Sequence, residues 1–217
     1  MGAEKEIWLQ VTVPIASFAI PQAREFVESY PFPPPATVYG MLLSLIGETD
    51  RWKYVGTRVG IVLKSLPLPT VILRKIRRVK EKKLNHPNNS KPDYQTLLTG
   101  LDFLVRLRDW TDGSFVDRIA EALRNPERIQ RFGGLSCGES HNMVDQIRII
   151  SLEEAEQYLL DAEWAVMPKE EGDWTCPVWV DHVGSEGTVW EKAVLFPIDE
   201  NFSANELQDF EIVAPGH

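Results

Sequence analysis

The order in which hydrophobic periodicity changes along the chain is the strongest constraint on its fold. Apolar residues alternate with polar ones over 7–13, 58–64 and 101–107, a period of two that is typical of strands with one buried face. Pro14 is expected to end the first of these strands. Residues 144–150 have a strand-like composition as well. Four strands, separated by other elements, are therefore predicted.

Two helices are predicted between these strands. The first has its apolar face over residues 38–46 and ends at Gly47, a residue type that suits a helix C-terminus. The second begins near Ser114, which we expect to cap its N-terminus, and stops before Pro126. The resulting order is strand, helix, strand, strand, helix, strand. This is the β-α-β-β-α-β unit of ferredoxin-like α+β domains, which RNA-binding proteins and many enzymes share.

A basic run interrupts this unit between the second and third strands. Residues 74–83 (RKIRRVKEKK) contain seven basic residues and one acidic residue, a net charge of 7 − 1 = +6 in a chain whose net charge is −9. Closely spaced like charges repel one another, so the run predicts contact with a polyanion rather than a chance surface feature. Its apolar residues fit a strand or a helix. The dense turn signal at 85–92 favours a strand that enters a hairpin.

Charge divides the chain into two parts. Residues 1–150 hold 21 basic and 16 acidic residues, a net charge of +5, whereas residues 151–217 hold 2 and 16, a net charge of −14. We predict a ferredoxin-like domain over 1–151, including a basic insertion at 68–100. An acidic, β-type extension over 152–217, which carries four of the seven tryptophans, is expected to face solvent or a basic partner.

The remaining bulk features predict a cytoplasmic protein. No apolar run reaches the roughly 18 residues that span a bilayer, and the N-terminus does not read as a signal peptide. The two cysteines, Cys137 and Cys176, are far apart and show no CxxC spacing, which favours reduced thiols. Cys137 and His141 have no second ligand pair at metal spacing, so neither a metal nor a cofactor is expected.

Three interpretations fit the glycine-rich segment 133–138 (GGLSCG). It could be a turn that packs a helix against the sheet, or a loop whose backbone amides approach phosphates. It also matches the G-x-S-x-G nucleophile elbow, with Ser136, Asp181 and His182 in the chain order of a serine hydrolase. That elbow requires strand, turn, helix, whereas this segment lies between a helix and a strand. The hydrolase is therefore a remote alternative.

A metal-independent ribonuclease is a second alternative. His86 and Tyr94 lie close in sequence to the lysines of the basic run, and such side chains can act as general acid and base on RNA. The competing interpretation makes His86 a turn residue beside a proline.

Two segments resemble motifs of one protein family. Residues 28–42 (ESYPFPPPATVYGML), followed by LIG at 45–47, are similar to the first-helix signature of the Cas-five family. Residues 131–140 (RFGGLSCGES) resemble the glycine-rich motif of the same family, which belongs to the RAMP superfamily. These proteins are the subunits of type I CRISPR Cascade complexes that hold the 5′ handle of the guide RNA (crRNA).

The resemblance implies a non-catalytic RNA-binding subunit of a complex that serves antiviral defence or guides a transposon. Its thumb hairpin would lie between crRNA nucleotides and contact the backbone subunit (Cas-seven). The body would contact the large subunit, and target DNA would be reached indirectly through the complex. One branch of the family cuts precursor crRNA with a Tyr, Lys and His set that includes a Lys-His dipeptide. That dipeptide is absent from this sequence.

The predicted RNA-binding residues fall in three groups. Hydroxyl groups and glycine amides give sequence-tolerant contacts to phosphate and sugar, and long cations neutralise the backbone. The first group surrounds the start of the first helix, the second is the basic run, and the third is the glycine-rich segment: Arg24, Ser29, Tyr30, Pro34 and Thr37; Arg74, Lys75, Arg77, Arg78, Lys80, Lys82 and Lys83; and Arg131, Gly133, Gly134 and Ser136.

Overall fold

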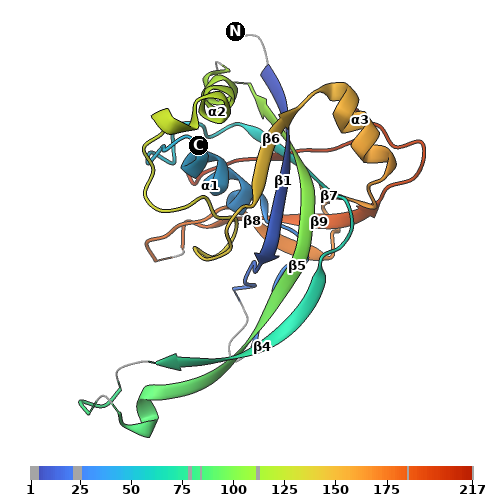
Figure 1. Cartoon of the computed structure of the whole chain (residues 1–217). Coiled ribbons are helices and arrows are strands. Elements are labelled where there is room, and N and C mark those ends of the chain that lie inside the picture. Colours follow the sequence, from blue (N-terminus) through green and yellow to red (C-terminus); the bar gives the residue numbers. More distant parts are fainter. Residues whose placement is uncertain are drawn as a thin grey trace.

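The chain has an α+β architecture built on a single, mainly antiparallel sheet (Figure 1), which confirms the predicted class. The computed structural model describes residues 5–21, 26–77, 80–83, 85–110, 113–184 and 186–216. Within these ranges no helix is both long enough and apolar enough to cross a membrane.

Four strands form one half of the sheet, in the order β6-β1-β5-β3. They are β1 (Lys5–Ala16), β3 (Arg58–Leu63), β5 (Ser90–Asp109) and β6 (Gln146–Ile150), and each pairs antiparallel with its neighbours. Helix α1 (Pro35–Leu45) follows β1, and helix α2 (Ser114–Arg124) follows β5. The order of these six elements along the chain is the predicted one.

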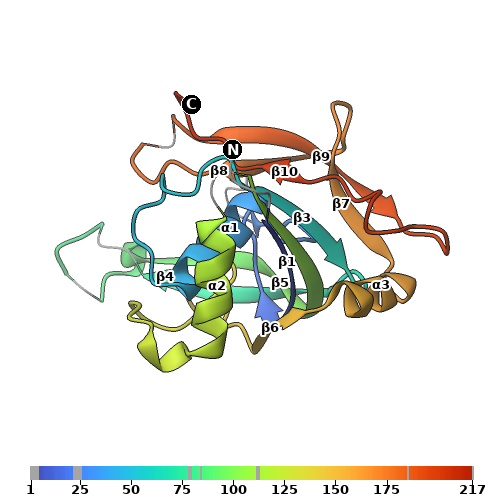
Figure 2. The ribbon, with the colours of Figure 1, turned by 90° about the horizontal axis from the view of Figure 1, so that it is seen from above.

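The sheet separates two hydrophobic cores because successive residues of a strand point to opposite faces. On one face, Leu9 and Val11 of β1 pack in the core that α1 and α2 cover. On the other, Trp8 packs with Leu104 and with α3 (Leu152–Leu160). Figure 2 shows α1 and α2 on one side of the sheet and α3 on the other.

The C-terminal strands continue the same sheet beyond β3. Strand β7 (Trp164–Pro168) pairs with β3, β9 (Val189–Pro197) pairs with β7, and β8 (Trp174–Trp179) pairs with β9. The short strand β10 (Phe210–Glu211) also pairs with β3. The strands expected at 163–167, 175–183 and 188–196 are therefore present, although β8 ends earlier than expected.

The basic run lies in a long hairpin. Strand β4 (Leu68–Arg77) pairs with the first half of β5, from Leu68 opposite Thr99 to Arg77 opposite Ser90. For residues 74–77 of the basic run this confirms the strand interpretation over the helical one, whereas residues 80–83 lie in the turn that follows. Strand β5 is much longer than the predicted 101–107, since its second half lies in the sheet and its first half in the hairpin. The short strand β2 (Phe26–Val27) pairs in parallel with β5 beside the hairpin.

Two local predictions were wrong. Gly113, with φ +72°, occupies the N-cap position of α2, and Ser114 is the first helical residue. Asp109 at the end of β5 instead accepts a hydrogen bond from the Phe115 amide at 3.0 Å, so a buried carboxylate from the sheet satisfies this helix end. Pro14 does not end β1, which continues to Ala16. Proline has no backbone N–H group to donate, but β6 pairs with β1 only as far as Thr12, so no hydrogen bond to β6 is lost at position 14.

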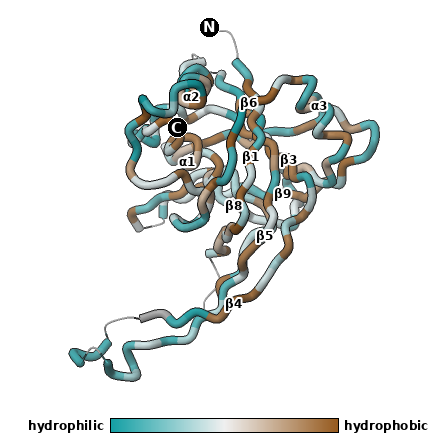
Figure 3. The backbone as a smooth tube through the Cα atoms, viewed as in Figure 1, coloured by the Kyte–Doolittle hydropathy of each residue, from teal (hydrophilic) through white to brown (hydrophobic). Residues whose placement is uncertain are grey.

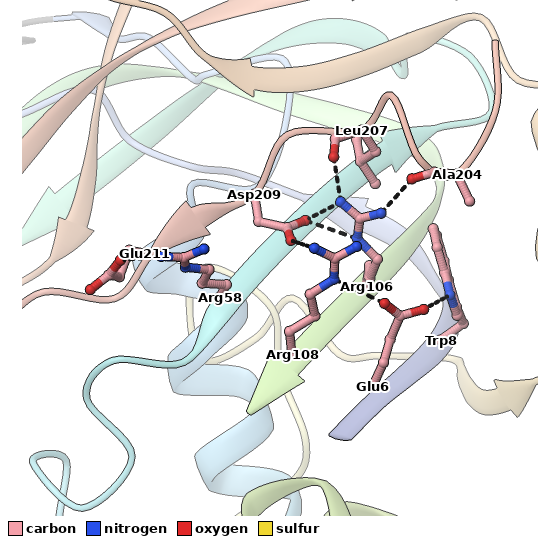
Figure 4. Close-up of polar contacts among 9 residues, drawn as sticks. All are labelled: Glu6, Trp8, Arg58, Arg106, Arg108, Ala204, Leu207, Asp209 and Glu211. Atoms are coloured by element: carbon pink, nitrogen blue, oxygen red, sulfur yellow. Dashed lines mark hydrogen bonds and ion pairs between the residues drawn. The ribbon is translucent and has the colours of Figure 1, made fainter. Parts of the chain in front are cut away.

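A buried ion pair fixes the C-terminal segment to the back of the sheet (Figure 4). The guanidinium of Arg106 on β5 is 1% exposed and donates to Asp209 Oδ1 at 2.7 and 3.0 Å, and to the carbonyls of Ala204 and Leu207. Arg108 also lies 3.4 Å from Asp209. A buried charge is tolerated when it is paired in this way, and removal of one partner typically costs about 3–5 kcal/mol.

Gly60 gives this segment the room that it needs. It lies on β3 opposite Arg106, and a Cβ atom there would lie 2.4 Å from Asp209 Oδ1 and 2.8 Å from Leu207 Cδ2. We expect Gly60→Ala to lower the free energy of unfolding by about 1–3 kcal/mol, measured by denaturant titration, because the ion pair must shift.

Gly40→Ala is the matched control. Gly40 lies in α1 and nothing approaches its Cβ position within 4 Å. Alanine favours a helix over glycine by up to about 1 kcal/mol, so this variant should be neutral or more stable. Equal destabilisation by both substitutions would contradict the role given to Gly60.

Candidate nucleic-acid interface

The two motif segments, about a hundred residues apart in sequence, meet at the end of β1. On one side, the Phe18 amide donates to Ser29 Oγ at 2.8 Å and the Tyr30 amide donates to the Phe18 carbonyl at 2.9 Å. On the other side, Asn142 Oδ1 accepts from the amides of Ser17 and Glu139 at 3.2 and 2.9 Å. The end of β1 therefore holds both motif segments in place.

The glycine-rich loop lies directly against this strand end. A Cβ on Gly138, which has φ +100°, would lie 2.6 Å from the Ser17 carbonyl oxygen, so glycine is required for the close approach. The neighbouring Cys137 is fully buried. Segment 133–138 is thus a packed loop between η2 (Pro126–Arg128) and β6, which is not the strand-turn-helix context of a nucleophile elbow.

A first cavity of about 250 Å³ opens between α1, this loop and the end of β8. Hydroxyl side chains from the exposed face of α1 and from the loop line it, together with one guanidinium and one imidazole: Thr37, Ser44, Ser136, Arg51 and His182. No carboxylate is among its lining residues. Hydroxyls, backbone amides and a cation are the groups that bind the phosphate and sugar of a nucleic acid.

Arg51 is held in one orientation in this cavity. Its guanidinium carbon lies 4.6 Å from the centre of the Trp179 ring, and its Nη2 donates to the Val180 carbonyl. The Tyr39 hydroxyl donates to the Arg51 carbonyl at 2.7 Å. The side chain therefore has little rotamer freedom to lose when an anion binds.

A second cavity of about 350 Å³ adjoins the first and shares Thr37, Gly138 and Val180 with it. It has more apolar walls, formed by aromatic rings and prolines from the chain just after β1, from the first motif segment and from the C-terminal strands: Phe18, Tyr30, Pro34, Pro177 and Trp190. Ser17 and Glu139 add polar groups. Together the two cavities are called the motif groove below.

The structure places four of the predicted residues on the motif groove: Tyr30, Pro34, Thr37 and Ser136. Tyr30 is 3% exposed and its hydroxyl donates to the Thr175 carbonyl at 2.5 Å; burial raises its pKa to about 12. Ser29 Oγ is engaged with the backbone of Phe18 and Tyr30. These two side chains shape the groove rather than offer free polar groups to it.

Other predicted residues lie elsewhere. Gly133 and Gly134 line neither cavity of the motif groove, and Arg131 borders a different cavity between α2 and β6. Arg24 and Arg78, with the side chain of Arg77, lie outside the described residues. The sequence analysis missed Arg51 altogether and considered His182 only as a member of the hydrolase triad. They lie outside both motifs, and only the folding of β8 against α1 brings them to the groove.

The basic hairpin extends away from the body and is most hydrophilic toward its far end (Figure 3). Lys75, Lys80, Lys82 and Lys83 are exposed there. The turn is built around Asn89, which is 6% exposed; its Oδ1 accepts from the amides of Lys80 and Glu81 at 2.7 and 2.8 Å. Its Nδ2 donates to two carbonyls of the same turn. The lysines are therefore displayed on an ordered framework.

The root of the hairpin is bonded to the glycine-rich loop. Gln95 on β5 donates from Nε2 to Glu139 Oε1 at 2.6 Å and to Ser17 Oγ at 3.0 Å. Arg74 pairs with Asp93 at 2.8 Å and lies 3.9 Å from Glu139. Arg74 thus has acidic partners at the root, and the hairpin and the motif groove are parts of one network.

The structure also shows the contacts of side chains that were named for the two alternative enzymes. Ser136 and His182 line the same cavity, but the Asp181 carboxylate accepts from the amides of Val183 and Gly187, within its own turn. His86 Nδ1 accepts from the Asn88 amide at 3.3 Å and caps η1 (Pro87–Asn89). His86 therefore has the turn role that its place beside a proline suggested.

Known proteins share this architecture. A chain from a structure titled "CRISPR RNA-guided surveillance complex" superposes with a TM-score of 0.63 at 14% identity, covering 89% of this chain and 90% of that one. A "Crystal structure of Cas protein" gives 0.55 at 16% identity, covering 90% and 96%. The fold is thus an α+β fold with an antiparallel sheet that Cas proteins share.

Sequence comparison narrows this class to a family. The family described as "CRISPR-associated protein (Cas_Cas5)" matches residues 6–213. "CRISPR-associated protein Cas5" of Myxococcus xanthus (strain DK1622) is 37% identical over 212 residues, covering 93% of this chain and 94% of that protein. The chain belongs to the Cas5 (Cas-five) family of CRISPR-associated proteins, which confirms the resemblance seen in the two motifs.

The two thiols of the interface region should be inert in the native state. Cys137 and Cys176 are free and buried, and burial raises the pKa of each to about 12. Only the thiolate is nucleophilic, so at pH 8 both groups remain protonated as well as covered. We expect a thiol reagent to label neither in the native protein and both in denaturant, measured by mass spectrometry. Rapid labelling of native protein would contradict this packing.

Proposed function

We propose that this chain is the non-catalytic subunit of a type I CRISPR Cascade complex that holds the 5′ handle of crRNA. One observation carries the proposal. Two motif segments that are distant in sequence line a single groove of hydroxyls, apolar walls and one fixed guanidinium, and that groove is bonded to the root of a basic hairpin. The relative with the same fold in a structure titled as an RNA-guided surveillance complex supports this setting.

The two parts of this interface have different roles in the proposal. The core is a ferredoxin-like RNA-binding unit, and the hairpin is its thumb. The exposed lysines of the thumb neutralise phosphates and reach the backbone subunit (Cas-seven), whereas the motif groove holds the handle. Base pairing by the guide, not the protein, then reads the target DNA.

The acidic C-terminal part provides protein contacts in this proposal. Residues 152–217 carry almost no basic side chains, which suits a surface that avoids RNA and meets the large subunit. The segment also contributes His182 and Trp190 to the motif groove. We therefore propose RNA contact mainly over 1–151 and partner contact mainly over 152–217.

Salt dependence of RNA binding tests the thumb. Each phosphate contact adds about 0.7 to the slope of log affinity against log salt for single-stranded RNA. We expect neutralisation of four exposed hairpin lysines to reduce the slope by about 3 for RNA that carries a type I repeat 5′ handle. Filter binding or fluorescence anisotropy over a salt series measures this slope. The variant is Lys75→Gln, Lys80→Gln, Lys82→Gln and Lys83→Gln.

A matched control removes four exposed cations far from the hairpin and makes the same change in net charge. It should leave the slope nearly unchanged. An equal loss in both variants would show that net charge alone, not the hairpin, governs binding. The control is Arg124→Gln, Arg128→Gln, Lys169→Gln and Lys192→Gln.

Processing of precursor crRNA is the alternative function, because one branch of the family has that activity. His86 Nδ1 already accepts the capping hydrogen bond from the Asn88 amide, which argues against a general base at that nitrogen. We expect full repeat RNA to remain intact when incubated with the protein in chelator, as judged on a denaturing gel. Cleavage at one site that His86→Ala abolishes would make the protein an endoribonuclease instead.

A further inference from the structure

The second cavity of the motif groove has the composition of a pocket for a flat heterocycle. At about 350 Å³ it is near the small end of the range for ligand pockets, about 300–1,000 Å³. Phe18 and Tyr30 are almost fully buried in its wall, and Trp190 on β9, which also lines it, is 39% exposed. Aromatic walls with a few convergent polar groups suit a stacked base.

The polar end of this pocket is a carboxylate. Glu139 lines the cavity and is 30% exposed through its side chain. Gln95 Nε2 donates to its Oε1 at 2.6 Å, and His141 Nε2 lies 3.3 Å from its Oε2. Since a carboxylate offers about four acceptor sites, each oxygen keeps capacity for a further donor. Arg74 at 3.9 Å offsets part of the negative charge.

The residues that hold Glu139 have spare hydrogen-bonding capacity. In the described part of the chain, three buried side-chain atoms lack a hydrogen-bond partner: Arg74 Nε, Gln95 Oε1 and Asn142 Nδ2. All three belong to the residues that contact Glu139 or its backbone amide. Unpaired buried polar atoms are costly and need an explanation. These three lie on residues around Glu139, which lines the pocket, and not on the pocket lining itself.

We infer that this pocket binds one nucleobase of the RNA, with Glu139 reading an edge of N–H donors, as guanine presents. The inference rests on the proposed function. Guanine has adjacent donors at N1 and N2 that match two carboxylate oxygens, whereas adenine and cytosine place one amino group beside an acceptor. The adjoining cavity, with Arg51 and its hydroxyls, lies where the sugar and phosphate of that nucleotide would follow.

Selection from a pool of single-stranded RNA of randomised sequence tests this inference. Wild-type protein should enrich guanine at one position of the bound RNA, and Glu139→Gln should lose that preference. Glu153→Gln, the same substitution at an exposed position on α3, is the control and should keep it. Inosine at the selected position, which lacks the N2 amino group, should weaken wild-type binding about 10- to 100-fold but leave Glu139→Gln binding unchanged.

Two further measurements keep the inference falsifiable if Glu139→Gln does not fold. The inosine comparison uses wild-type protein alone. Trp190→Ala removes the most exposed aromatic ring of the pocket lining and should weaken binding of the selected RNA about tenfold.

The outcomes separate this inference from the proposed function. Wild-type binding without a base preference, or a preference that Glu139→Gln retains, overturns the base pocket and leaves handle binding intact. Equal weakening of all sequences by Glu139→Gln also overturns it, because the side chain would then only hold the loop. No RNA binding by wild-type protein overturns both.

Discussion

The pairing of β5 is the constraint on which the rest of the structure depends. Its second half pairs with β1 and β3 in the sheet, and its first half pairs with β4 in the hairpin. A single continuous strand therefore fixes the direction of the basic hairpin relative to the body. Because each half is held by its own ladder of hydrogen bonds, the hairpin extends the sheet and is not a separate appendage. The side chains that join the hairpin to the motif groove, above all Gln95, are carried on this strand.

A small polar cluster at the end of β1 turns that geometry into a potential binding site. Ser17, Gln95, Glu139 and Asn142 are joined by hydrogen bonds, and Ser17, Gln95 and Asn142 are almost fully buried. Networks of this kind in a low-dielectric interior hold their members rigidly when they are satisfied. Here only Gln95 Oε1 and Asn142 Nδ2 lack a partner, and Ser17 and Glu139 of the same cluster line the second cavity. The rigid network supports the shape of the groove, and the remaining hydrogen-bonding capacity of Glu139 can serve a ligand.

The C-terminal segment is part of the fold as well as part of the groove. Its strands continue the sheet from β3, and the pairing of Arg106 with Asp209 holds residues 204–209 on the face opposite α1 and α2. Trp179 at the end of β8 then meets α1 and places Arg51 over its ring. The acidic segment thus positions a cation at the interface although it contains almost none itself.

The sequence by itself determined the order of the elements and the family, and it favoured a strand for the basic run. Hydrophobic period is a local property, so strands at 7–13 and 58–64 and a helix near 38–46 can be read from neighbouring residues alone. The residues of the two motif segments identified the family in the same way. The motif groove could not be predicted, since Arg51, His182 and Trp190 belong to no motif and reach it only through the packing of β8 and β9. The N-terminal cap of α2 could not be predicted either, because the Asp109 carboxylate of β5 accepts the hydrogen bond that was expected to go to Ser114. Contacts between residues distant in sequence depend on how the whole chain packs, and only the tertiary structure decided them.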